Sequence, residues 1–111
     1  MNYVPAIKSA TPVAEFEVAG HTAVLLDEIV SAGSIQYLYI LAVYTPNDEP
    51  CLFVASEVNG MQQQFGGGSH FLGLFPGDGH LNLGDSNDWA DRDHFVKKAL
   101  AIVKEQLTGE T

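Results

Sequence analysis

The segment from residue 35 to residue 44 limits the possible folds most, because it is apolar on both alternating faces and carries no charged side chain. Its content of Ile, Tyr and Val is typical of a β-strand. A strand of this kind lies in the middle of a sheet and is covered on both sides. Its alternation places Ile35, Tyr37, Tyr39, Leu41 and Val43 on one face and Leu38, Ile40, Ala42 and Tyr44 on the other.

Other segments with the pattern of strands surround it, each followed by residues typical of turns. Strands joined by short turns pair antiparallel, so the pattern predicts an antiparallel β-meander of five to six strands. Residues 1–12, which include Pro5 and Pro12, are expected to be a loose lead-in. The further strands are expected over residues 13–18, 21–30, 51–58, 70–75 and 80–83. In the second of them, the alternation places Val24, Leu26 and Val30 on one face and Ala23, Leu25 and Ile29 on the other.

The C-terminal part of the chain predicts one amphipathic helix over residues 86–107. Asp85 or Asp88 is expected to cap its start, and Gly109 fits its end. The chain of 111 residues is thus expected to be a single α+β domain, in which a meander over residues 13–84 packs against this helix. Whether the sheet is strongly curled is left open. The apolar residues at helical spacing are Phe95, Val96, Ala99, Leu100, Val103 and Leu107.

The cysteine content and the apolar runs indicate a cytoplasmic protein. Cys51 is the only cysteine and cannot form an internal disulfide, so nothing points to secretion. Residues 1–12 lack the apolar core of a signal peptide. The longest apolar run, residues 38–44, is far shorter than the roughly 20 residues of a membrane helix.

The formal net charge is -9, and its distribution excludes several partners. No Lys or Arg occurs between Lys8 and Arg92. Nucleic-acid phosphates and acidic membrane surfaces are bound through such residues, so neither is an expected partner. An acidic surface favours solubility, and it would also attract a basic protein partner.

One helix covers one face of a sheet, so the second apolar face of the central strands needs another cover. The sheet could curl around that face, a second copy could cover it, or a specific partner could do so. None of the predicted strands contains Lys, which often prevents sheet edges from pairing. Self-association as a homodimer or a higher oligomer is therefore expected.

The segment from residue 70 to residue 89 holds the densest polar chemistry. His and Asp together bind divalent metals or transfer protons. The simpler interpretation is that Asp78 lies in a glycine turn and that residues 85–88 cap the helix. We favour the simpler interpretation and assign no metal ligand, cofactor or catalytic residue. The polar residues are His70, Asp78, His80, Asn82, Asp85, Ser86, Asn87 and Asp88.

Known loop motifs do not fit the chain. Val96 stands where a calcium loop starting at Asp85 needs its bidentate Glu. Residues 66–69 are glycine-rich, but His70 follows them where a phosphate loop needs Lys. Ser69 and His70 would point to opposite faces if both lay in a strand, and could not then share a proton.

Aromatic and polar side chains of the central strand and of the polar segment form a candidate ligand site. Tyrosines with an apolar body and a polar tip line such cavities in small barrels. The alternative is that the tyrosines are ordinary strand residues and that the tryptophan packs the helix onto the sheet. The candidate ligand-binding residues are Tyr37, Tyr39, His70, Asp78, His80 and Trp89.

Three functions remain compatible with the sequence. The first is a small, acidic, non-enzymatic interaction module, regulatory or inhibitory, which binds a protein partner. The second is a domain that binds a small ligand or a metal ion. The third is a structural subunit whose homo-oligomer is the function. Sheet-then-helix order is shared by many unrelated folds, so it decides none of them.

Overall fold

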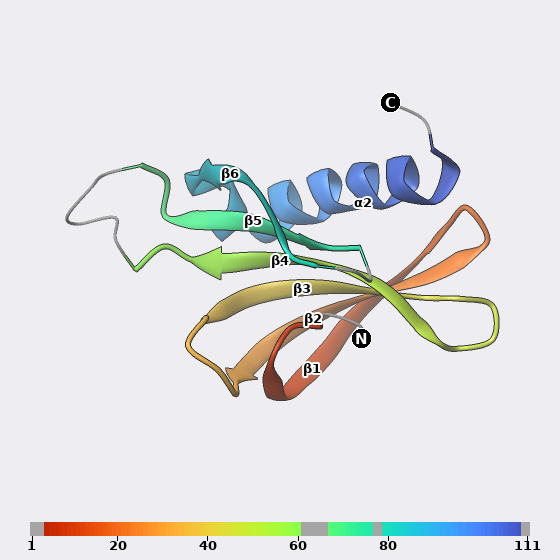
Figure 1. Ribbon diagram of the computed structural model, residues 1–111, viewed down its shortest axis with the longest axis horizontal. Helices are drawn as coiled ribbons and strands as arrows, with labels where there is room; N and C mark the ends of the chain where they lie inside the picture. The colour runs from red at the N-terminus through yellow and green to blue at the C-terminus, as the bar shows by residue number, and fades with distance from the viewer. Residues whose placement is uncertain (1–3, 61–66, 77–78, 110–111) are drawn as a thin grey trace.

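The computed structural model describes residues 4–60, 67–76 and 79–109. It confirms the predicted α+β class: a meander of six antiparallel strands packs with one C-terminal helix, and the sheet does not close (Figure 1). The strands follow one another in chain order, so β1 and β6 are the two edges. The elements are β1 Ile7–Val18, β2 His21–Ser31, β3 Tyr37–Tyr44, β4 Pro50–Val58, β5 His70–Phe75, β6 Leu81–Ser86, the 3-10 helix η1 Asn87–Ala90 and the α-helix α2 Arg92–Thr108.

The first strand begins earlier than the expected lead-in allows. It starts at Ile7 and continues through Pro12, which the sequence analysis took as a barrier to regular structure. Proline is tolerated there because β1 is an edge strand, with no other described strand along one of its two sides. The pairing of β1 with β2 shifts register on both sides of Pro12, between Ser9 and Thr11 and between Pro12 and Ala14.

The predicted capping residues of the helix were wrong. The Ser86 side chain accepts a hydrogen bond from the Asp88 N–H at 3.0 Å and caps η1. Asp91 caps α2 by accepting from the His94 N–H, also at 3.0 Å. The chain therefore makes one short turn before the helix that the periodicity predicts. Gly109 ends α2 with a φ of 73°, as expected.

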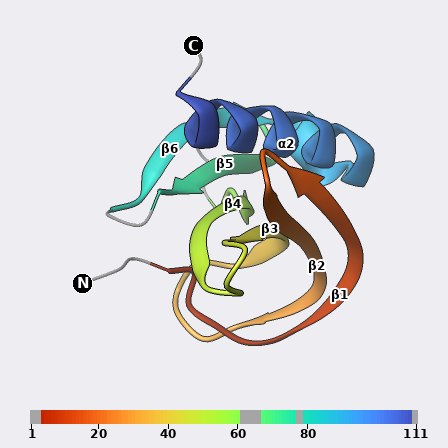
Figure 2. The same ribbon diagram turned by 90° about the vertical axis from the view of Figure 1, so that its right-hand side faces the viewer.

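The two apolar faces of the sheet form two separate cores. On the helix face, Leu41 and Val43 of β3 pack with Phe95 and Val103 of α2. On the opposite face, Ile40 packs with Tyr37, Ala55 and Phe75, and half-buried side chains of β1 and β2 surround this smaller cluster. Figure 2 shows how β1 and β2 curl away from the helix and around this face. The second face is thus partly covered by the curvature of the sheet itself.

Two bulges change the faces that strict alternation predicts. Tyr37 and Tyr39 were expected on one face, but Tyr37 lies in the cluster opposite the helix and Tyr39 packs on the helix face. The β3–β4 register shifts between these two residues. The extra residue in β3 reverses the alternation of side chains, so the two tyrosines point to opposite faces. In β2, Glu28 has a φ of 50°, and Leu26 and Ile29 on either side of it pack on the same face rather than on opposite faces.

Candidate functional site

The structure divides the predicted ligand residues between the two faces of the sheet. Tyr39 and Trp89 pack in the core on the helix face, and the alternation of β5 places His70 on that face too. Tyr37 lies on the opposite face, where His80 stacks on Phe75. Tyr37 and His80 thus share one face of the sheet, and Tyr39, His70 and Trp89 share the other. Asp78 lies outside the described residues.

On the helix face these side chains hold the fold together. The Tyr39 ring stacks on Phe95, with centroids 5.7 Å apart. Burial and the nearby Asp27 carboxylate raise the pKa of Tyr39. The buried Ser56 hydroxyl donates a 2.6 Å hydrogen bond to the carbonyl oxygen of Trp89 and so attaches η1 to β4. Tyr39 and Trp89 therefore have structural partners in α2 and in β4, respectively.

The polar segment around η1 fixes a neighbouring loop. The Asp85 carboxylate accepts from the Gly68 N–H at 2.5 Å, and the Asn87 side-chain oxygen accepts from the Ser69 N–H at 2.8 Å. A side chain at Gly68 would overlap the Ser86 backbone, so only glycine fits there. Among the residues that the structure describes, no three His, Cys, Asp or Glu side chains are arranged to hold a metal ion.

The prediction that Ser69 and His70 could not share a proton was wrong. The Ser69 Oγ and the His70 Nδ1 are 2.8 Å apart. The reason is that β5 begins at His70, so Ser69 precedes the strand and is not bound by its alternation. Burial lowers the pKa of His70.

On the face opposite the helix, the sequence analysis missed an ionisable pair made of a buried carboxylate and a partly exposed imidazole. The Glu57 Oε2 lies 2.8 Å from the His80 Nε2, and the His80 ring stacks on Phe75 with centroids 4.3 Å apart. Burial raises the pKa of Glu57, while the His80 imidazole lowers it in part. Glu57 is the one charged residue in β4, and that was the available signal. Its partner comes from a different hairpin and could not be identified locally.

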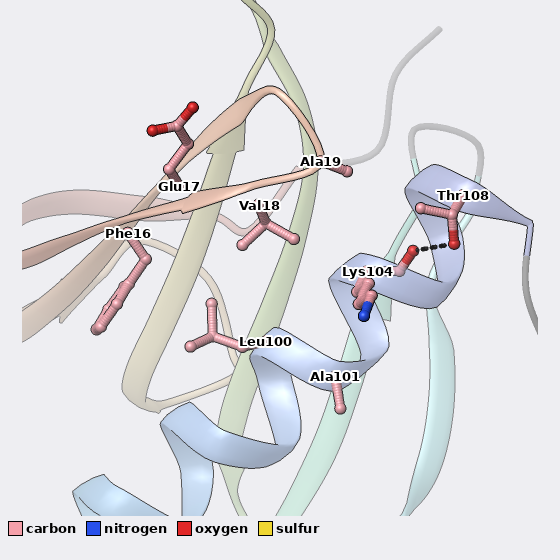
Figure 3. Close-up of a pocket in the computed structure, with 8 residues that line it drawn as sticks. All are labelled: Phe16, Glu17, Val18, Ala19, Leu100, Ala101, Lys104 and Thr108. Atoms are coloured by element: carbon pink, nitrogen blue, oxygen red, sulfur yellow. Dashed lines mark hydrogen bonds between the residues drawn. The ribbon is translucent and has the colours of Figure 1, made fainter.

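A hollow lies elsewhere, between β1 and α2. Two adjoining cavities of about 650 and 530 Å³ share Phe16 and Leu100 and together form what we call the β1–α2 groove. In Figure 3, Val18 points toward the helix and Phe16 toward Leu100, whereas Glu17 points away. The groove is lined by Ala14, Phe16, Glu17, Val18, Ala19 and Leu25 from the hairpin and by Arg92, Asp93, Val96, Lys97, Leu100, Ala101, Lys104 and Thr108 from α2.

Basic side chains gather along the helix side of this groove. The chain has five Lys and Arg residues, and Arg92, Lys97 and Lys104 line the groove. The floor is formed by the apolar side chains of Phe16 and Leu100. Both pack against the core on the helix face and are only partly buried, so part of each side chain faces the groove. Two carboxylates, Glu17 of β1 and Asp93 of α2, also line the groove, so its three cations exceed its acidic groups by one.

The free edge of the sheet runs along the other wall of the groove. Among the residues that the structure describes, β1 pairs only with β2, so no described strand lies beside its outer backbone groups. An exposed strand edge is a template for pairing with another chain. A segment that adds to β1 would place alternate side chains over the groove.

A second, smaller hollow of about 250 Å³ lies on the face opposite the helix. Its lining residues Leu26, Ile40 and Phe53 belong to the smaller core cluster. The same cluster contains Phe75, on which the His80 ring stacks. The hollow is apolar and close to the lower size limit of small-ligand sites. It is lined by Val4, Pro5, Ile7, Leu26, Ile40, Ala42, Tyr44, Pro50 and Phe53.

In the part of the chain that the structure describes, no helix has the length and apolar character needed to cross a membrane. Comparison with known proteins finds no matching family model, no matching curated protein and no matching solved structure.

Proposed function

We propose that this chain is a non-enzymatic protein-interaction module that binds an extended segment in the β1–α2 groove. The observation that carries the proposal is the combination of an unpaired strand edge with an apolar groove directly beside it. Strand addition of this kind gains affinity from backbone hydrogen bonds and specificity from the pockets that receive alternate side chains.

The groove also defines the chemistry of the segment. Its floor of Phe16, Val18 and Leu100 favours apolar side chains at every second position. Its wall of Arg92, Lys97 and Lys104 favours acidic side chains at the outer positions. The sequence analysis expected a basic partner from the overall charge, whereas the groove favours an acidic and apolar segment.

A library of random peptides displayed on phage tests the proposal. We expect the selected peptides to alternate apolar and acidic residues and to shift the backbone amide resonances of β1 and α2. Leu100→Glu places a charge in the groove and should weaken a selected peptide at least about tenfold, or about 1.4 kcal/mol. Lys104→Glu, at an exposed position, should weaken acidic peptides without affecting the fold.

Glu57→Gln is the matched control, because Glu57 lies on the opposite face of the sheet. It should bind the selected peptide as the wild type does. Peptides that bind equally well to Leu100→Glu and Lys104→Glu, or a selection that yields no binder, would contradict the proposal.

A small-ligand site on the opposite face is the second candidate function. It is favoured by the Glu57–His80 pair and an apolar hollow on the same face of the sheet, since ligand sites combine an apolar lining with a few polar groups. Ligands that perturb Phe53, Phe75 and His80 rather than β1 and α2 would support it instead.

A further inference from the structure

We propose that the segment bound in the β1–α2 groove is β6 of a second copy of this chain, so that the molecules associate head to tail. This inference rests on the proposed function and names its partner. Its starting point is that the two free edges of the sheet differ in chemistry and complement each other.

The edge strand β6 exposes apolar side chains on the correct face. Leu81 and Leu83 are 52% and 45% exposed. Leu81 pairs with Leu74, which belongs to the core on the helix face, and paired residues project to the same face. The exposed Leu81 is thus on the face that contains the groove at the other edge of the sheet.

The strand directions also fit. Every pair of neighbouring strands is antiparallel, so β6 runs opposite to β1. A second copy that places its β6 beside β1 therefore continues the same antiparallel sheet with the helices on one side. Leu81 of that copy would then lie beside Phe16 and Val18, over the groove.

Charge distinguishes this arrangement from the symmetric ones. Pairing β1 with β1 would bring Glu15 and Glu17 close to the same residues of the other copy, and like charges across strands destabilise pairing. Pairing β6 with β6 would leave the groove open to water. β6 carries one acidic residue, Asp85, and the groove carries three cations and two carboxylates, so pairing the unlike edges brings the fewest like charges together.

The contact is expected to be weak and dependent on concentration. Gly84, with a φ of 112°, and the register shift in the β5–β6 pairing end the regular part of β6 after a few residues. A bulge shortens the edge that is able to pair. A contact between unlike surfaces forms rings or open chains rather than a closed two-fold dimer.

Two variants and their mixture test the proposal by analytical ultracentrifugation. Leu81→Lys with Leu83→Lys blocks β6, and Ala101→Glu blocks the groove; all three positions are exposed. We expect the wild type to self-associate and each variant alone to be monomeric. An equimolar mixture should form a one-to-one dimer, because one intact β6 meets one intact groove.

Each other result overturns the inference. A β6-blocked variant that still dimerises would indicate β1–β1 pairing, and a groove-blocked variant that still dimerises would indicate β6–β6 pairing. A wild type that is monomeric up to about 1 mM would exclude a contact stronger than about 4 kcal/mol. Leu83→Lys alone and Lys104→Glu, both exposed, repeat the test if a first variant does not fold.

The same samples separate this inference from the proposed function. The β6-blocked variant keeps an intact groove, so it should bind the phage-selected peptides. If it binds them while the wild type does not self-associate, only the second-copy inference fails. If it neither binds peptides nor pairs with the groove-blocked variant, both proposals fail.

Discussion

Gly73 shows how one missing side chain makes room for the buried Glu57 carboxylate and its His80 partner. It lies in β5 between Ala55 of β4 and Asn82 of β6, its paired residues in the two neighbouring strands. A Cβ atom at this position would overlap the Glu57 carboxylate and lie 2.9 Å from the His80 Nε2. The contact between Glu57 and His80 thus crosses the sheet directly above this glycine.

Gly73→Ala should therefore destabilise the protein by about 1–3 kcal/mol, the usual cost of forcing extra atoms into a packed site. Urea unfolding followed by circular dichroism measures it. Gly60→Ala is the control, because its Cβ meets nothing within 4 Å and its φ is not positive. Equal stability of Gly73→Ala and the control would show that the pair relaxes without cost.

The helix α2 has two unlike apolar sides, although its periodicity looks uniform in the sequence. Phe95 is fully buried and stacks on Tyr39, whereas the next residue, Val96, is only partly buried and lines the groove. The sequence analysis placed both among the residues of one apolar face. Only the position of β1 relative to the helix separates them.

Phe95→Ala should lower the free energy of unfolding by about 3–5 kcal/mol, because it leaves a cavity in the core on the helix face. Val96→Ala removes atoms that already contact an open groove, so it should cost less than about 1 kcal/mol. Thermal and urea unfolding of both variants provide the comparison. A large loss in Val96→Ala would mean that the groove is a packed part of the core.

At the scale of the whole molecule, the net charge of -9 opposes contact between copies. The proposed contact joins the uncharged start of β6 to a groove with cations, so few like charges meet at the contact itself. The long-range repulsion between two molecules of the same net charge remains. Salt reduces that field, since the screening length falls from about 10 Å at 0.1 M to about 3 Å at 1 M.

Self-association should therefore strengthen with salt, by at least about threefold between roughly 0.05 and 0.5 M sodium chloride. Sedimentation equilibrium at several salt concentrations measures it, with the β6-blocked variant as the monomeric control. Weaker association at high salt would mean that direct attraction between groove cations and acidic groups dominates, which contradicts this prediction.

The sequence by itself determined the elements that depend on neighbours along the chain. The uncharged segment around Leu41 predicts a central strand, and the spacing of Phe95, Ala99 and Val103 predicts the helix, because burial follows local periodicity. Gly109 likewise predicts the end of α2, because glycine readily adopts the left-handed conformation with which helices commonly end.

Only the tertiary structure decided which side chains meet. A bulge in β3 moved Tyr37 to the face opposite Tyr39, and no local rule marks where that extra residue lies. Glu57 and His80 come from different hairpins and meet across Gly73. The groove lies between Phe16 of β1 and Leu100 of α2, which are 84 positions apart in the sequence. It exists only because α2 packs across the sheet next to the edge strand β1.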